Sequence, residues 1–324
     1  MATGPIGEFE LIARYFMRDG GAAPRVELGI GDDCALIDGG ATSQWAVTAD
    51  MLVEGVHFLP DVDPEALGHK ALAVNLSDLA ACGATPRCFF LALALPTTDE
   101  KWLDSFSRGL FALADRFGCA LAGGDTTRSA QGVTVSITAL GEVPRGRALL
   151  RSGAAVDDEV WVSGTLGEGA LGLACRRGTV TEPDARAVTR LERPEPRVQL
   201  GEQLRGVASS AIDVSDGLAG DLGHILERSG VAATLQWDAI PRSAALRRLP
   251  GEQQRQFVLG GGDDYELLFT APPRAAEQVL CAASKAGLTV TRIGAIRAGS
   301  GLTVVDAGER AMDIEPRAFD HFRP

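Results

Sequence analysis

Apolar and polar positions alternate along the chain in a pattern that predicts both helices and strands. Phe9, Ile12, Ala13 and Phe16 recur at helical spacing, so the segment 8–18 is expected to form an amphipathic helix. Proline and glycine at segment ends help to place the other elements. Helices are expected at 64–82, 99–117, 197–206, 218–229 and 275–286 and after Gly164 and Gly167, and strands at 45–49, 87–95, 120–122, 133–143, 159–162, the segment into Asp213, 265–270 and 288–296.

A change of composition in the middle of the chain indicates a domain boundary. The stretch 144–158 is rich in Arg, Gly and Ala and has no clear period, so we place the boundary near residue 150. The charged, proline-punctuated stretch 178–196 is expected to be a surface excursion. Both halves, 1–150 and 151–324, mix helices with strands, which predicts two domains of α/β or α+β class.

The composition argues against a membrane protein and a secreted one. The longest apolar run, residues 88–95, ends at Pro96 and is far shorter than the roughly 20 residues of a membrane-spanning helix. The amino-terminal segment has no basic region followed by an apolar stretch, so no secretory signal is expected. The sequence therefore predicts a cytoplasmic protein that does not bind membranes.

Cysteine spacing and net charge limit the possible cofactors and partners. The six cysteines form no CxxC pair and none has a histidine at ligand spacing, so reduced, mostly buried thiols are expected and zinc is not. A net charge of −12 without a long basic run argues against nucleic-acid binding. A phosphate substrate would need a positive ion, most simply a divalent metal, between its oxygens and the carboxylates of the protein.

Aspartates gather at predicted strand ends, several of them beside glycine. Ligand sites in α/β proteins lie at such ends. Any one of these aspartates could serve only its turn, because turns favour aspartate. Four clusters together indicate a site; their members are Asp32 and Asp33, Asp50, Asp125, and Asp213 with Asp216.

Asp78 is different because it lies in a predicted helix that is apolar nearly all round. A buried carboxylate without a partner costs several kcal/mol or becomes protonated, and a metal ion removes that cost. An internal ion pair with Lys70, two turns earlier, is the alternative. Hard oxygen ligands without nearby His or Cys favour Mg²⁺ over zinc. An EF-hand is excluded, since the twelfth position counted from Asp213 is His224.

Glycine-rich segments supply possible phosphate contacts. Residues 123–127 and 260–264 can present successive backbone N–H groups to an anion, although tight turns alone also explain glycine. The GxxxxGK[ST] motif and the HRD and DFG motifs are absent, which excludes P-loop enzymes and protein kinases. Several Mg²⁺ ions held by aspartates could support phosphoryl transfer by positioning and charge neutralisation, without a separate catalytic base. His57 is the one histidine near an aspartate cluster, and a packing role is its alternative.

In this order, the motifs resemble those of the thiamine-monophosphate kinase family, within the aminoimidazole-ribonucleotide-synthetase-like ATP-binding superfamily. The resemblance runs from Gly7 to Phe322, and its most specific blocks are GIGDD, NLSDLAA and DVSDGL. It implies transfer of the γ-phosphoryl group of ATP to thiamine monophosphate, giving thiamine diphosphate and ADP. It also implies a homodimer formed through the sheet of the amino-terminal domain, a carboxy-terminal α/β domain, and ATP bound in a cleft shared across the dimer.

The same resemblance assigns roles to individual residues. The implied ligands of several Mg²⁺ ions are Asp33, Thr48, Asp50, Asp78, Asp125, Asp213 and Asp216. The implied nucleotide contacts are Gly124, Asp125, Arg151 and Ser215. The implied contacts of thiamine monophosphate are His57, Asp263 and Phe319, where Phe319 offers an aromatic face to the cationic thiazolium.

Three positions depart from the family pattern. Ala49 stands where a hydroxyl residue is frequent, Asp263 where Glu is usual, and Phe319 where Trp or Tyr is commoner. The open alternatives are another ATP-using member of the superfamily and a non-catalytic, metal-stabilised nucleotide-binding protein. The reactive Cys of selenophosphate synthetase and the carboxy-terminal Cys of the hydrogenase-maturation protein have no counterpart here.

Overall fold

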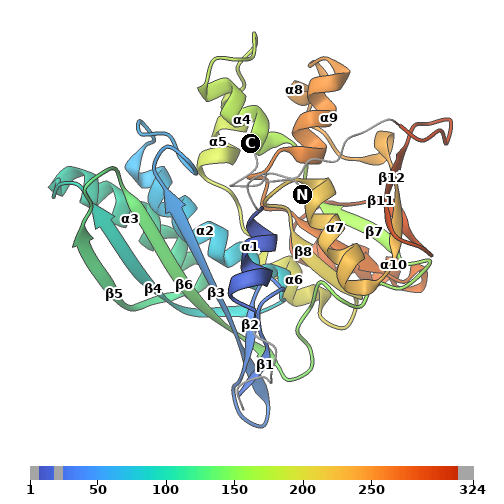
Figure 1. Cartoon of the computed structure of the whole chain (residues 1–324), viewed down its shortest axis with the longest axis horizontal. Coiled ribbons are helices and arrows are strands. Elements are labelled where there is room, and N and C mark those ends of the chain that lie inside the picture. Colours follow the sequence, from blue (N-terminus) through green and yellow to red (C-terminus); the bar gives the residue numbers. More distant parts are fainter. Residues whose placement is uncertain (1–6, 18–24, 313–324) are drawn as a thin grey trace.

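The computed structural model describes residues 7–17 and 25–312 of the chain. These residues form two six-stranded sheets. Figure 1 shows the sheets side by side, with the amino-terminal one on the left and helices packed around both. The predicted mixed α/β or α+β class is therefore confirmed. The boundary near residue 150, which falls in the connection between the two sheets, stays a prediction.

The first sheet has the strand order β1-β2-β3-β6-β4-β5. Its neighbours are antiparallel except β4 and β5, which are parallel because a helix connects them. The strands are β1 (Val26–Leu28), β2 (Ala35–Asp38), β3 (Ser43–Val53), β4 (Thr85–Leu95), β5 (Ala120–Arg128) and β6 (Thr134–Pro144). This order leaves β5 as an edge strand.

Two long helices cover one face of the first sheet. Helix α2 (Pro64–Ala81) begins after Asp63, whose side chain caps its first turn. Helix α3 (Glu100–Phe117) is capped by Asp99 and ends at Gly118, which has the left-handed φ of 60°. These features confirm the two helices predicted at 64–82 and 99–117.

Helices α2 and α3 pack together closely because each contributes a glycine to the contact. A Cβ on Gly68 would lie 2.0 Å from the carbonyl oxygen of Phe106. A Cβ on Gly109 would lie 1.8 Å from the carbonyl oxygen of Glu65. No side chain fits at either position, so the backbones themselves are in contact.

The second sheet has the strand order β12-β9-β11-β7-β10-β8. All neighbours are antiparallel except β12 and β9. The strands are β7 (Glu159–Ser163), β8 (Ser210–Asp213), β9 (Ala232–Gln236), β10 (Leu267–Ala271), β11 (Val290–Arg297) and β12 (Gly301–Val305). Strands β8 and β10 are buried at every position, as expected for strands covered on both faces.

Helices of the second half surround this sheet. They are α4 (Glu168–Arg176), α5 (Ala185–Glu192), α6 (Val198–Leu204), α7 (Leu218–Ser229), α8 (Ala244–Arg247), α9 (Gly251–Gly260) and α10 (Ala276–Lys285), with 3-10 turns at Trp237–Ala239 and Pro273–Ala275. The surface excursion expected at 178–196 contains α5, whose Ala187 and Leu191 are buried. Gly172 of α4 permits this packing, because a Cβ there would lie 2.3 Å from the carbonyl oxygen of Ala187.

Two predicted strand ends are wrong. Strand β3 continues through Asp50 to Val53, since residues 51–53 pair with β6. Strand β5 likewise runs through the expected turn at 123–125. Gly124, with a φ of 155°, lies so close to β4 that a Cβ would meet the carbonyl oxygen of Leu91 at 1.8 Å. The glycine therefore serves strand packing.

Helix α2 links the two halves of the molecule. It packs against α6 and β8 of the second half as well as against the first sheet. One hydrophobic core consequently contains Leu72 and Leu76 of α2 together with Phe269 of β10. The arrangement brings α2 next to the carboxyl end of β8.

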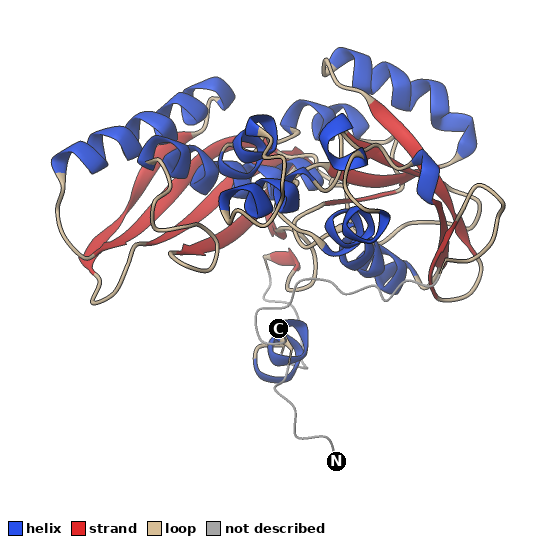
Figure 2. Cartoon of the chain, turned by 90° about the horizontal axis from the view of Figure 1, so that it is seen from above, coloured by secondary structure: helices blue, strands red, loops and turns tan. Residues whose placement is uncertain are grey.

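The amino-terminal helix α1 (Glu8–Tyr15) lies apart from both sheets, as Figure 2 shows. None of its residues is buried, and the ring of Phe9 lies 4.3 Å from the ring of His224. The predicted amphipathic helix is thus confirmed for residues 8–15; residue 18 lies outside the described residues. Among the described helices, none combines the length and the apolar character needed to cross a membrane.

Candidate active site

Three carboxylates from distant parts of the chain meet beside α2. Asp33 lies just before β2, Asp78 lies in α2, and Asp213 ends β8. One carboxylate oxygen of each lies within 4.8 Å of the others. We refer to these three residues as the acidic cluster. All three are among the metal ligands predicted from the sequence.

Hydroxyl groups orient two members of the acidic cluster. Ser77 Oγ donates to Asp213 Oδ2 at 2.6 Å. Thr48 Oγ1 donates to Asp78 Oδ2. The structure therefore places Thr48, also predicted at the metal site, against the cluster, and it adds Ser77, whose role the sequence did not indicate.

Arg151 holds the loop that carries Asp33. Its guanidinium donates to Asp33 Oδ1 from Nη2 at 2.7 Å and from Nε at 3.3 Å. Its backbone N–H donates to the carboxylate of Asp32. Arg151, predicted as a nucleotide contact, thus lies at the acidic cluster and brings a positive charge to it.

Burial and mutual repulsion make the carboxylates of the site hard to ionise. Burial, with the charge of Asp33 adding to it, raises the pKa of Asp213 to about 8 and that of Asp50 to about 6. Burial also raises the pKa of Asp78 well above its usual value, and the charges of Asp50 and Asp213 add to that effect. A cation bound here would relieve both penalties.

The donor set fits a magnesium ion. The acidic cluster offers carboxylate oxygens and contains neither His nor Cys, as Mg²⁺ prefers. Asp33 Oδ2 is buried and accepts no hydrogen bond from any described residue. A buried carboxylate oxygen without a donor is costly unless a cation lies against it.

The predicted ligands Asp216 and Ser215 follow β8 in a loop held by a further carboxylate. Asp221 in the first turn of α7 is buried, and its Oδ2 accepts the backbone N–H groups of Ser215 and Asp216 at 3.1 Å each. Asp213 lies at the start of the same loop. Sequence reasoning missed Asp221, although an acidic residue in the first helical turn after the DVSDG motif is a usable signal.

Asp125, the remaining predicted metal ligand, lies away from the acidic cluster within one chain. Asp50 is aligned with Ile137 of β6, Ile137 with Leu91 of β4, and Leu91 with Gly124 of β5. Three strand spacings, about 14 Å, therefore separate Asp50 from Gly124. Asp125 follows Gly124 in β5, so it is separated from Asp50 by the same three strand spacings.

Asp125 also faces the opposite side of the sheet from Asp50. Through the ladders, Asp125 is aligned with Ala92, Ala92 with Ser136, and Ser136 with Met51. Aligned residues share a face, and successive residues of a strand alternate faces. Met51 is the neighbour of Asp50 in β3 and is 56% exposed. One chain therefore cannot place both aspartates on one ion.

A cavity next to the cluster contains two of the three predicted substrate contacts. His57, Asp263 and Lys70 line it together with apolar side chains that include Phe58 and Leu173. His57 Nδ1 accepts the backbone N–H of Val53 at 3.0 Å, which leaves Nε2 as the protonated ring nitrogen. The third predicted contact, Phe319, lies outside the described residues.

Lys70 does not form the internal ion pair considered for Asp78. Its ammonium lies 2.9 Å from Asp263 Oδ1 and donates to the carbonyl oxygen of His57 at 3.3 Å. The alternative explanation of Asp78 by Lys70 is therefore wrong. Lys70 belongs to the cavity instead.

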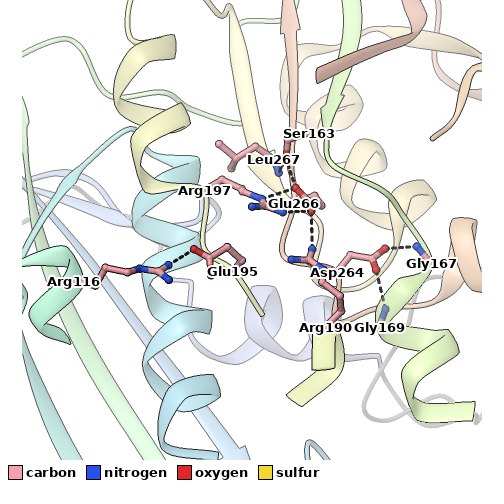
Figure 3. Close-up of polar contacts among 10 residues, drawn as sticks. All are labelled: Arg116, Ser163, Gly167, Gly169, Arg190, Glu195, Arg197, Asp264, Glu266 and Leu267. Carbon is pink, nitrogen blue, oxygen red and sulfur yellow. Dashed lines mark hydrogen bonds and ion pairs between the residues drawn. The ribbon is translucent and has the colours of Figure 1, made fainter. Parts of the chain in front are cut away.

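The GGDDYELLF segment is held in place by the contacts that Figure 3 shows. Asp264 accepts the backbone N–H groups of Gly167 at 2.6 Å and Gly169 at 3.0 Å, at the start of α4. Glu266 is 1% exposed and pairs with Arg190 and Arg197. Among the acidic side chains of this segment, the sequence analysis assigned a role only to Asp263. The neighbouring acidic residues anchor the loop that carries it.

Tyr265 connects the cavity with the acidic cluster. Its hydroxyl donates to Asp263 Oδ1 at 3.1 Å. Burial raises the pKa of Tyr265 well above its usual value, and the charges of Asp263, Asp50 and Asp213 add to this effect. The segment of Asp263 and Tyr265 also lies beside the loop that begins at Asp213, because Asp263 N donates to Ser215 O at 2.9 Å and Tyr265 N to Val214 O at 2.8 Å.

Comparison with known proteins agrees with this arrangement. The family models "AIR synthase related protein, N-terminal domain" and "C-terminal domain" match residues 31–143 and 155–307. The thiamine-monophosphate kinase of Salmonella typhimurium is 46% identical over 322 residues, 98% of each chain. That of Bacillus subtilis is 35% identical and covers 92% of this chain and 94% of its own.

Solved structures give the same result. A thiamine-monophosphate kinase from Stenotrophomonas maltophilia has a TM-score of 0.77 and 47% identity, covering 93% of this chain and 97% of its own. AaThiL complexed with AMPPCP and TMP has a TM-score of 0.83 and 31% identity, covering 98% and 97%. A chain of the HypE–HypF complex, at 18% identity and a TM-score of 0.76, shares the fold alone. The chain belongs to the thiamine-monophosphate kinase family.

Proposed function

We propose that this protein transfers the γ-phosphoryl group of ATP to thiamine monophosphate, giving thiamine diphosphate and ADP. The observation that carries the proposal is that the segment of Asp263, which lines the cavity with His57, is hydrogen-bonded to the loop that begins at Asp213 of the acidic cluster. The cluster suits a metal-bound phosphate chain and the cavity suits an organic ring system. The complex of AaThiL with AMPPCP, an analogue of ATP, and TMP supports the same pair of ligands.

Several Mg²⁺ ions are proposed to serve the reaction. Bound Mg²⁺ neutralises phosphate charge and supports in-line transfer. The proposed ligands are Asp33, Thr48, Asp50, Asp78, Asp125, Asp213 and Asp216. The unsatisfied Asp33 Oδ2 and the raised pKa of Asp213 support this assignment for the cluster.

The protein's own residues position the two phosphate groups. We assign Arg151 to the nucleotide phosphates, because a guanidinium forms bidentate bonds with phosphate and can exchange Asp33 for it. Ser215, Gly124 and Asp125 are the further proposed nucleotide contacts. His57, Asp263 and Phe319 are proposed to hold thiamine monophosphate. No side chain is assigned as a general base, since positioning and charge neutralisation dominate phosphoryl transfer.

A homodimer completes this site in the proposal. The face of the first sheet that α2 and α3 leave open carries Met51 and Phe90, which are 56% and 42% exposed. Strand β5 is an exposed edge, and β2 pairs only with residues 44–47 of β3. We propose that β5 of one protomer lies beside residues 48–53 of the other, which brings the partner's Asp125 to the strand that carries Asp50. The division at residue 150 and the cytoplasmic location also remain proposals.

The decisive experiment is product analysis with purified protein, ATP and Mg²⁺. Thiamine monophosphate, thiamine and aminoimidazole ribonucleotide precursors are supplied in parallel. Formation of thiamine diphosphate from thiamine monophosphate alone is the expected result. ADP release with another acceptor would assign the protein to a different reaction of the superfamily. ATP binding without any turnover would favour a non-catalytic nucleotide-binding protein.

A further inference from the structure

The carboxylate of Asp263 is held by one oxygen and open at the other. Lys70 Nζ lies 2.9 Å from Oδ1, and the hydroxyl of Tyr265 donates to the same Oδ1 at 3.1 Å. No residue that the structure describes donates a hydrogen bond to Oδ2. The side chain of Asp263 is 31% exposed and lines the cavity. Its free acceptor is therefore Oδ2.

We propose that Lys70 and Tyr265 are positioning residues for substrate recognition: they fix Oδ1 of Asp263 so that Oδ2 faces the cavity and accepts a hydrogen bond from the organic part of the substrate. The inference rests on the proposed function for the identity of that substrate. A nitrogen-bound hydrogen of the aminopyrimidine ring of thiamine monophosphate is a donor of the required kind.

Lys70 is well placed because it contacts both substrate residues. Its side chain is 4% exposed and, besides Asp263, its ammonium donates to the carbonyl oxygen of His57 at 3.3 Å. The lysine lies on α2, two turns before Asp78 of the acidic cluster. One rigid helix therefore sets the spacing between the metal ligand and the substrate carboxylate.

Tyr265 also fixes the carboxylate, and its position has a conformational cost. Asp263 and Tyr265 have φ angles of 67° and 51°, a region that residues other than glycine rarely adopt. Backbone bonds hold them there: Asp263 N donates to Ser215 O at 2.9 Å and Tyr265 N to Val214 O at 2.8 Å. Strain of this kind persists where the surroundings impose it and is concentrated at functional sites.

A merely structural ion pair would give a different pattern of contacts. Lys70 and Tyr265 could each have bonded a different oxygen of Asp263, which would have satisfied the carboxylate and left no acceptor for a ligand. Both bond Oδ1 instead. The arrangement thus fixes Oδ1 and leaves Oδ2 without a donor among the described residues.

Steady-state kinetics of Tyr265→Phe and Lys70→Met test the proposal. Each variant is expected to raise the KM for thiamine monophosphate about tenfold, because one charge-assisted bond that orients Asp263 is lost. The kcat and the KM for ATP should stay within about twofold of wild type. The lost contact binds thiamine monophosphate equally in the ground state and the transition state, so its loss changes only the KM for that substrate. Tyr265→Phe removes a single hydroxyl and is expected to fold even if Lys70→Met does not.

Matched controls come from the same residue types. Lys285→Met and Tyr15→Phe replace an exposed lysine and the only other tyrosine, and both should behave as wild type. An unchanged KM for thiamine monophosphate in folded Tyr265→Phe would overturn the role of Tyr265. Equal losses for both substrates would indicate a structural role only and would also overturn the proposal.

A double-mutant cycle separates positioning from direct contact. In an Asp263→Asn background, Tyr265→Phe should raise the KM by less than about twofold further, because its effect passes through the carboxylate. Additive effects of the two substitutions would contradict the inference. If wild type itself fails to phosphorylate thiamine monophosphate, the proposed function fails instead. Binding of thiamine monophosphate, measured by calorimetry for wild type and Tyr265→Phe, then still decides whether Tyr265 positions Asp263 for the ligand.

Discussion

Asp78 is half-buried and lies among the charges of Asp33, Asp50 and Asp213, and burial and charge both determine the effect of Asp78→Asn. Loss of one metal ligand is expected to reduce phosphoryl transfer at least about 100-fold. The metal-free variant should be as stable as wild type or more stable by about 1 kcal/mol, because an uncompensated buried charge is removed. Product formation and urea unfolding without Mg²⁺ measure the two effects.

The control for this substitution is Asp115→Asn, which changes an exposed aspartate on α3. It should leave activity and stability as they are in wild type. Turnover at the wild-type rate in Asp78→Asn would contradict its assignment as a metal ligand. A large loss of metal-free stability would show that Asp78 is already compensated in the apo protein.

His224 should make the protein sensitive to acid. Burial, with the charges of Arg151 and Arg228 adding to it, lowers the pKa of His224 from 6.5 to about 4. The folded state therefore favours the neutral ring, and the stability this gives is present above pH 6.5 and lost as the pH falls through about 4. Between pH 7 and pH 4.5 the free energy of unfolding should fall in both proteins, and the fall should be about 2 kcal/mol smaller in His224→Phe than in wild type.

Urea unfolding at both pH values measures this difference. Phenylalanine keeps a ring against Phe9, whose centroid lies 4.3 Å from that of His224, so the packing is preserved while the titration is removed. Equal losses for variant and wild type would mean that His224 titrates normally in the fold.

At the residue scale the sequence predicted chemical types better than contacts. Asp33, Asp78 and Asp213 could be singled out because a carboxylate in an apolar or glycine-rich context is unusual. The ion-pair partner of Lys70 could not be predicted from the sequence, because either Asp78 or Asp263 could pair with it and only the tertiary fold decides between them. The choice of a single oxygen of Asp263 is likewise a product of packing.

Among the elements, the contact of α2 with α3 is the most restrictive. Gly109→Ala would place a Cβ 1.8 Å from the carbonyl oxygen of Glu65, so the two helices must separate. We expect a loss of about 2 kcal/mol in unfolding free energy, because overpacking costs more than the gain in helix propensity of about 1 kcal/mol. Urea denaturation measures it.

Gly223→Ala is the matched control within another helix. A Cβ on Gly223 of α7 would meet no atom within 4 Å. The substitution should therefore stabilise the protein by about 0.5–1 kcal/mol through helix propensity alone. If Gly109→Ala proved equally stabilising, the close approach of the helices would not constrain the fold.

Elements with strong local signals were predictable, and those formed by tertiary pairing were not. Helices α2, α3 and α7 have clear caps or glycines at their ends, and their bounds were predicted to within about two residues, the usual margin at helix ends. The extensions of β3 and β5 past Asp50 and Gly123 exist because neighbouring strands supply partners there. The hydrophobic pattern of a single segment does not indicate which strand will pair with it.

At the scale of the whole molecule, one protomer contains most of the proposed site and lacks one part of it. Asp50 and Asp125 lie about 14 Å apart across three strand spacings and on opposite faces of the sheet. The open face with Met51 and Phe90 and the exposed edge β5 give a second copy a surface to occupy. Single-chain patterns indicate both aspartates but carry no information about the proposed contribution of a second chain.

Mixing two inactive variants tests whether the site is shared. Asp50→Asn and Asp125→Asn should each be inactive as homodimers. A heterodimer has one site that lacks both carboxylates and one that is intact if the partner's Asp125 acts beside Asp50. A re-equilibrated equimolar mixture, in which half the dimers are mixed, should therefore regain about a quarter of wild-type activity. Mixing Asp50→Asn with Asp78→Asn should restore nothing, because one protomer supplies both residues. If neither mixture regains activity, Asp125 does not act in the partner's site. If only the mixture of Asp50→Asn with Asp125→Asn regains activity, the site is shared between the two protomers of a dimer.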